Sequence, residues 1–134
     1  MQDSIFTKII RGEIPCHKVY EDRDTFAFMT IQPVHPGHVL VVPKQQIQFV
    51  WDLPPDLYQA VMATSQKIGQ RIREVLQPDY VGVHIAGTEV PHAHVWVFPF
   101  QGDGDFWDRP VAMGSVPDEE LAAMAAQLRM EDNV

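Results

Sequence analysis

The chain has 134 residues, of which 46% are hydrophobic and 21% are charged, and its 10 Lys and Arg against 18 Asp and Glu give a net charge of −8. An acidic chain without a basic cluster is a poor partner for duplex nucleic acid or an anionic membrane. The single cysteine, Cys16, excludes an internal disulfide framework, and no apolar run reaches the roughly 18 residues that span a bilayer. The start of the chain lacks the features of a secretory signal, so we expect a cytoplasmic protein with one domain over 1–134.

Turn residues and hydrophobic spacing divide the chain into helices and strands. In chain order they predict a short helix that Asp3 or Ser4 caps and Gly12 ends, strands at 17–21, 25–30 and 38–43, and a long helix at 55–77. Strands at 79–85 and 90–98, an irregular loop at 101–117 and a final helix after Pro117 follow. Most connections are too short for parallel crossovers. The predicted fold class is therefore α+β, with a five-stranded antiparallel sheet.

The segment at 90–98 carries the most informative pattern. Side chains alternate along a strand, so His92, His94 and Trp96 share one face, and the two imidazoles lie roughly 7 Å apart at Cα. Three interpretations are open: a polar surface, a zinc site that His38 helps to form, or phosphoryl transfer with a neutral imidazole as nucleophile.

Four sequence blocks extend this pattern over most of the chain. They are SIFTKIIRGEIP at 4–15, KVYED at 18–22, PGHVLVVPK at 36–44 and EVPHAHVWV at 89–97. In their order and spacing, these blocks resemble the histidine triad (HIT) family, in its small single-domain nucleotide-hydrolase branch. The resemblance implies an antiparallel sheet of five strands with one long helix and short terminal helices, continuous with a second sheet across a homodimer. It covers about 4–100 and leaves 101–134 as a variable C-terminal extension.

The resemblance also implies roles for individual residues. His94 matches the nucleophile that attacks the α-phosphorus and forms a nucleotidyl-histidine intermediate. His92 matches the histidine that fixes and polarises this nucleophile, and His38 matches an upstream histidine that supports the triad. Five positions match the apolar wall around the base and sugar, although each is equally compatible with ordinary core packing: Ile5, Phe6, Ile9, Phe28 and Ile31.

The chain departs from the family pattern around the triad. Trp96 stands where the family has a third histidine or a glutamine, and an indole N–H donates a hydrogen bond but accepts no proton. Trp96 either borders the leaving-group side of the substrate site or packs against the loop that holds Phe106 and Trp107. Thr30 replaces an Asp that binds the ribose.

The loop before the triad is short. We expect Glu89, in this loop, to contact the substrate. His84 is either a further hydrogen-bond donor or a strand histidine satisfied by its neighbours. Many bacterial relatives bind a structural zinc ion with residues at the positions of Ser4, Thr7 and Gln46. Because these three are poor zinc ligands, we expect no metal and no cofactor.

The resemblance therefore predicts a hydrolase or transferase that acts at the α-phosphate of a purine nucleoside phosphoramidate or a dinucleoside polyphosphate. The alternative is a nucleotide-binding protein with little or no turnover because of Trp96. A third hypothesis is a metal-dependent site at His38, His92 and His94. The expected partners are a small purine nucleotide and a second copy of the chain.

Overall fold

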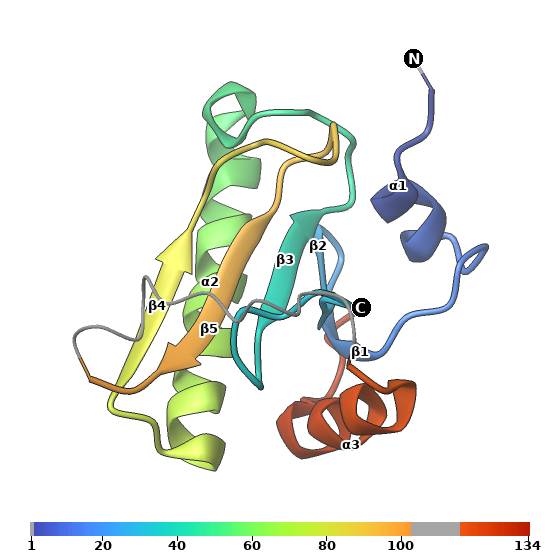
Figure 1. Cartoon of the computed structure of the whole chain (residues 1–134). Coiled ribbons are helices and arrows are strands. Elements are labelled where there is room, and N and C mark those ends of the chain that lie inside the picture. The colour runs from blue at the N-terminus through green and yellow to red at the C-terminus, as the bar shows by residue number, and fades with distance from the viewer. Residues whose placement is uncertain (1, 103–115) are drawn as a thin grey trace.

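The computed structural model describes residues 2–102 and 116–134 (Figure 1). Local sequence signals determine where its helices begin. Ser4 caps the first helix, and Pro55 begins the long one. In chain order the elements are α1 (Ile5–Ile10), β1 (Lys18–Glu21), β2 (Thr25–Met29), β3 (Val39–Pro43), the 3-10 turn η1 (Val50–Asp52), α2 (Pro55–Leu76), β4 (Tyr80–His84), β5 (Val95–Phe100) and α3 (Asp118–Leu128). The turn η1 is an element that the sequence patterns did not indicate.

The sheet has the strand order β1-β2-β3-β5-β4, and every neighbouring pair is antiparallel. The chain leaves β3, runs through the 22 residues of α2 and returns as β4. The following strand, β5, then inserts between β3 and β4, so that β4 lies at the edge of the sheet. The predicted antiparallel α+β fold with one long helix is confirmed in the described part of the chain.

Helices approach the sheet from two sides: α2 lies behind it, and α1 lies beside β2 and β3 (Figure 1). On one face, α2 and α3 pack through Ile68, Ile72 and Leu128 against the fully buried valines of β3 and β5. On the other face, Phe6 of α1 packs against Phe28 and other side chains of β2 and β3. Every residue of β3 is buried, as its continuous apolar run predicts for a strand covered on both sides.

The last described residues run alongside β1. After α3, the Met130 N–H donates to the Val19 carbonyl oxygen at 2.9 Å, and the Asn133 N–H donates to the Glu21 carbonyl oxygen at 2.8 Å. The predicted final helix is confirmed as α3, whereas Phe106 and Trp107 lie outside the described residues. In the described part of the chain, no helix combines the length and the apolar character needed to cross a membrane.

The structure differs from the sequence prediction at the start of β5, which begins at Val95 instead of residue 90. Glu89 has a φ of 74°, and two tight bonds follow, from the Val90 N–H to the Thr88 carbonyl (2.9 Å) and from the His92 N–H to the Val90 carbonyl (2.8 Å). These bonds between residues two apart form γ-turns, and Pro91 has no N–H for a strand ladder. His92 and His94 therefore lie on the loop that enters β5.

Candidate active site

His94 lies immediately before β5, and its ring orientation is fixed by the preceding loop. Nδ1 of His94 donates to the carbonyl oxygen of His92 at 2.8 Å. The proton of the neutral ring therefore sits on Nδ1, and Nε2 carries the lone pair. The His94 ring is buried and meets the Phe6 ring edge to face, with 5.2 Å between centroids.

His92 is fully buried, and both of its ring nitrogens are hydrogen-bonded. Nε2 donates to the Pro43 carbonyl oxygen at 2.8 Å, so Nδ1 accepts from the Ser4 hydroxyl at 2.7 Å. Burial lowers the pKa of His92, and the nearby His94 ring lowers it further, whereas the bond to Pro43 raises it. The result is a neutral ring that connects the end of β3 to the start of α1.

A polar cluster, formed by Ser4, Thr7 and Gln46, surrounds Nδ1 of His92. Ser4 Oγ accepts from the Thr7 N–H at 3.0 Å, which caps α1. Gln46 Oε1 accepts from the Ser4 N–H at 2.8 Å and from the Thr7 hydroxyl at 2.7 Å. Gln46 Nε2 donates to the Gln2 carbonyl oxygen at 2.9 Å. The cluster thus joins α1, the segment after β3 and the loop before β5.

These three side chains stand at the positions of the zinc ligands in the relatives, and the fold brings them together. Their hydroxyl and amide oxygens do not fit a structural zinc ion, which prefers thiolate, imidazole and carboxylate ligands. Among residues 2–102 and 116–134, no group of three or more His, Cys, Asp and Glu side chains is arranged to hold a metal. The metal hypothesis for His38, His92 and His94 is likewise unsupported, because both nitrogens of His92 already bond to protein atoms.

His38 lies immediately before β3, and Gly37 fixes its position. Gly37 has a φ of 97°, a backbone conformation that favours glycine, and a Cβ at this position would also press on Leu76 Cδ1 at 2.7 Å. Nδ1 of His38 accepts from the Val34 N–H at 3.1 Å, which places the proton of the neutral ring on Nε2. The ring packs 4.9 Å from the Trp96 ring centroid.

Trp96, the second residue of β5, lies on the same side of the sheet as His94. It is the second residue after His94, and its neighbours Val95 and Val97 point to the opposite face, into the core beneath α2. His84 of β4 lies directly opposite Trp96, and their rings meet edge to face at 4.8 Å. Trp96 therefore stands between His38 and His84, and its packing against Phe106 and Trp107 lies outside the described residues.

The expected apolar wall divides into buried and exposed parts. Phe6 and Phe28 are buried and meet edge to face at 5.5 Å, and Ile9 packs against them. Ile5 is 47% exposed and Ile31 is 70% exposed. The structure thus assigns Phe6 and Phe28 to the core under the site and leaves Ile5 and Ile31 with apolar surface available to a ligand.

Two further expected substrate contacts, Thr30 and Glu89, lie in loops. Thr30 follows β2 and is half-buried, and its Oγ1 accepts from the Gln32 N–H at 3.1 Å. Glu89 is exposed at the turn with positive φ. Sequence reasoning missed the carbonyl of Pro43 and the shared hydrogen bonds of Ser4, Thr7 and Gln46. The N-cap role of Ser4 was visible in the sequence, but its contact with a ring 88 residues away was not.

Comparisons with known proteins agree with this architecture. A model of the HIT domain matches residues 11–102. The Protein hit of Bacillus subtilis is 37% identical over 111 residues, which cover 78% of this chain and 75% of the relative. The adenosine 5'-monophosphoramidase HNT1 of Saccharomyces cerevisiae is 33% identical over 100 residues, which cover 71% of this chain and 61% of the relative.

Solved structures show the same similarity. A Hit-like protein from Bartonella henselae superposes with a TM-score of 0.83 at 32% identity, covering 95% of this chain and 94% of that one. A zinc-bound histidine triad family protein from Mycobacterium smegmatis superposes with a TM-score of 0.71 at 30% identity, covering 92% of this chain and 94% of that one.

Replacing Gln46 with methionine should lower the free energy of unfolding by about 1–3 kcal/mol, because the buried Ser4 N–H and Thr7 hydroxyl lose their acceptor. The matched control is Gln45→Met at the neighbouring exposed glutamine, which should change stability by less than about 0.5 kcal/mol. Urea unfolding measures both changes. Equal stability of the two variants would show that the polar cluster does not hold the fold together.

The lowered pKa of His92 predicts a stability loss in acid. Its ordinary value is 6.5, so below about pH 6.5 the unfolded ring takes up a proton that the folded ring does not. The free energy of unfolding should therefore fall with decreasing pH by up to about 1.4 kcal/mol per pH unit from this residue. Urea unfolding at several pH values between 7.5 and 5 measures this change. The free energy of unfolding should change less per pH unit for His92→Gln than for the natural chain. An identical pH dependence would contradict a lowered pKa for His92.

Proposed function

This chain belongs to the histidine triad family, and we propose on that basis that it is a nucleotide hydrolase or transferase with His94 as its nucleophile. Its substrate would be a purine nucleoside phosphoramidate or a dinucleoside polyphosphate. The observation that carries the proposal is the bond from His94 Nδ1 to the His92 carbonyl. This bond leaves the Nε2 lone pair available for attack on the α-phosphorus.

The same bond supports the charge that develops during the reaction. As a bond forms between Nε2 and phosphorus, the bond from phosphorus to the leaving group breaks and the leaving group departs with the electron pair. The His94 ring becomes positively charged while its Nδ1 keeps its proton. The His92 carbonyl oxygen already faces that proton, so the stabilising dipole is in place before the charge appears. Water then attacks phosphorus, breaks the bond to Nε2, and releases the nucleoside monophosphate.

The chemistry of the other expected site residues also fits a nucleotide. Ile5 and Ile31 offer exposed apolar surface that a base would cover, a gain of about 25 cal/mol per Å² of area removed from water. Thr30 Oγ1 accepts from Gln32, so its own proton remains for a ribose oxygen. These contacts, together with Glu89 and Trp96, form the proposed substrate-binding residues around the catalytic His94, His92 and His38.

A second candidate function is nucleotide binding with little or no turnover. Trp96 favours this alternative, because it stands two residues after the nucleophile and its indole exchanges no proton near neutral pH. The two functions differ in whether a bond to His94 forms and is then hydrolysed.

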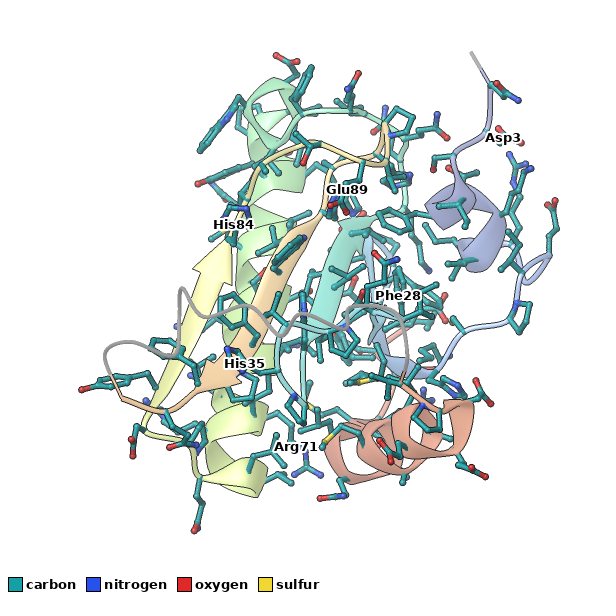
Figure 2. The ribbon with its side chains drawn as sticks, in the orientation of Figure 1. Asp3, Phe28, His35, Arg71, His84 and Glu89 are labelled. Atoms are coloured by element: carbon teal, nitrogen blue, oxygen red, sulfur yellow. The ribbon has the colours of Figure 1, made fainter. Side chains whose placement is uncertain are left out.

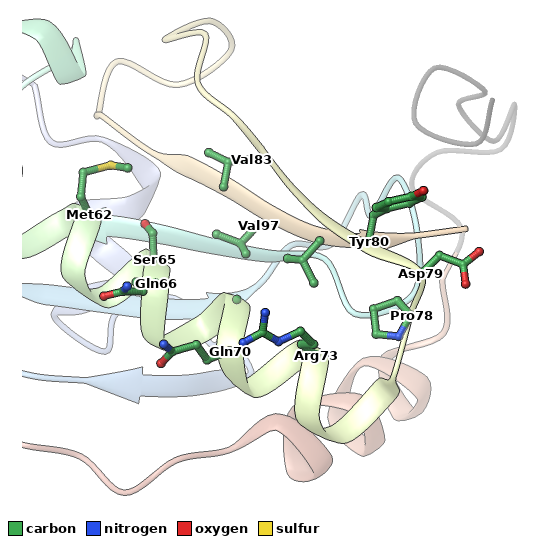
Figure 3. Close-up of a pocket in the computed structure, with 12 residues that line it drawn as sticks. Met62, Ser65, Gln66, Gln70, Arg73, Pro78, Asp79, Tyr80, Val83 and Val97 are labelled. Atoms are coloured by element: carbon green, nitrogen blue, oxygen red, sulfur yellow. The ribbon is translucent and has the colours of Figure 1, made fainter. Parts of the chain in front are cut away.

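We also propose that the chain forms a homodimer through β4. This strand is an edge of the sheet, and its Tyr80 and Val83 are 50% and 47% exposed. A groove of about 580 Å³ runs between β4 and α2 beside these residues (Figure 3). A second copy that pairs along this edge would cover the unpaired strand and these apolar side chains, and it would make the two sheets continuous.

Substitution of His94 with glutamine should reduce AMP release from adenosine 5'-phosphoramidate by at least about 10³-fold, because the nucleophile is lost. Mass spectrometry of protein quenched during turnover should detect a nucleotidyl group on the natural chain and none on the variant. His17→Gln is the matched control, since this histidine binds Asp118 on the surface. A natural chain that binds AMP but releases none from the phosphoramidate would favour the binding alternative.

Substitution of Val83 with arginine should convert the proposed dimer to a monomer, because it places a charge on the exposed apolar edge of β4. Sedimentation velocity gives the mass of the species in solution. Val134→Arg is the control for an added charge at an exposed valine, and it should leave the dimer intact. A Val83→Arg protein that sediments like the natural chain would contradict this interface.

A further inference from the structure

The replacement of the third triad residue by Trp96 leaves one chemical requirement unmet. An amine that departs from phosphorus takes the electron pair of the P–N bond and needs a proton as the bond breaks. The indole N–H of Trp96 does not give up its proton near neutral pH, and Nε2 of His94 is occupied by the new bond to phosphorus. Another group on the same side of the sheet has to supply the proton.

His84 is placed to do so. It is the last residue of β4, and it lies directly opposite Trp96 in the antiparallel pair with β5. Its ring meets the Trp96 ring edge to face at 4.8 Å, so both side chains occupy the sheet face that carries His94. His84 is half-buried, and within residues 2–102 and 116–134 its ring nitrogens form no hydrogen bond, which leaves them accessible to a bound molecule.

His84 and His94 are both neighbours of Trp96 on this side of the sheet. His84 pairs with Trp96 across the two strands, and His94 lies two residues before Trp96 along the chain, just ahead of β5. Phosphorus stands about 3–3.5 Å from an attacking nitrogen, and the leaving atom lies beyond it, roughly in line. A leaving amine would thus depart into the space between the two imidazoles.

We propose that His84 is the general acid that protonates the leaving group, in place of the missing third triad histidine. This inference rests on the proposed function of His94. As the bond from His94 Nε2 to phosphorus forms and the P–N bond breaks, the electron pair stays on the amine nitrogen. That nitrogen takes a proton from the His84 imidazolium, and the amine leaves. Neutral His84 then accepts a proton from the water that hydrolyses the intermediate, which restores both histidines.

The other four histidines are less suitable. His92 has both nitrogens bonded to protein, and His38 is buried with its Nδ1 bonded to Val34. His17 bonds to Asp118 of α3. His35 stacks on Phe98 near the end of β5, whereas His84 lies at the end of β4, so the two occupy opposite ends of these antiparallel strands (Figure 2).

A comparison of leaving groups tests the proposal. Adenosine 5'-phosphoramidate releases an amine that needs a proton, whereas the p-nitrophenyl ester of AMP releases a phenolate that does not. His84→Gln should slow release from the phosphoramidate by about 10²–10⁴-fold and change release from the ester by only a few fold. His35→Gln, the matched control, should affect neither. An equal loss on both substrates would show a structural role, and no loss on the phosphoramidate would show that His84 is not the acid.

A rescue experiment supplies an independent test. In the double variant Trp96→His, His84→Gln, the restored third histidine should recover most of the phosphoramidate activity that His84→Gln loses. A double variant as slow as His84→Gln would overturn the proposal that His84 takes the place of the third triad histidine. Failure of the natural chain to release product from both substrates would instead overturn the proposed function of His94, and this inference with it.

Discussion

The fully buried ring of His92, hydrogen-bonded at both nitrogens, is the constraint on which the site depends. Its partners are the Ser4 hydroxyl at the start of α1 and the Pro43 carbonyl at the end of β3, 88 and 49 residues away along the chain. A buried polar group left without a partner costs about 1–3 kcal/mol, so the loop before β5 has one favoured arrangement. His94 takes its orientation from that loop through the His92 carbonyl.

The polar cluster around His92 achieves this placement with uncharged groups. The Ser4 hydroxyl satisfies Nδ1, and burial keeps the ring neutral, so no fixed positive charge lies beside His94. This matters for the proposed chemistry, because the His94 ring itself becomes positively charged during attack on phosphorus. A neutral neighbour and a carbonyl dipole favour that charge, whereas an imidazolium at His92 would oppose it.

On the sheet face near His94, Trp96 occupies a position where the family has a residue that can exchange a proton. The Trp96 ring contacts those of His38 and His84. Its indole packs between them but does not exchange a proton near neutral pH. Cross-strand pairing places His84 opposite Trp96, which is where the proposed proton donor is needed.

The sequence by itself determined the order and type of the helices and long strands, because caps, prolines and hydrophobic spacing are local signals. It also identified His92 and His94 as candidate site residues on one face of the predicted strand. It did not determine that they precede β5, since the γ-turns at Glu89 and Pro91 compete with strand pairing only in the folded loop. Tertiary structure alone decided that Ser4, Gln46 and Pro43 enclose the His92 ring, and that His84 faces Trp96. These contacts join distant segments, and their partners are chosen by strand register and burial, which no local pattern encodes.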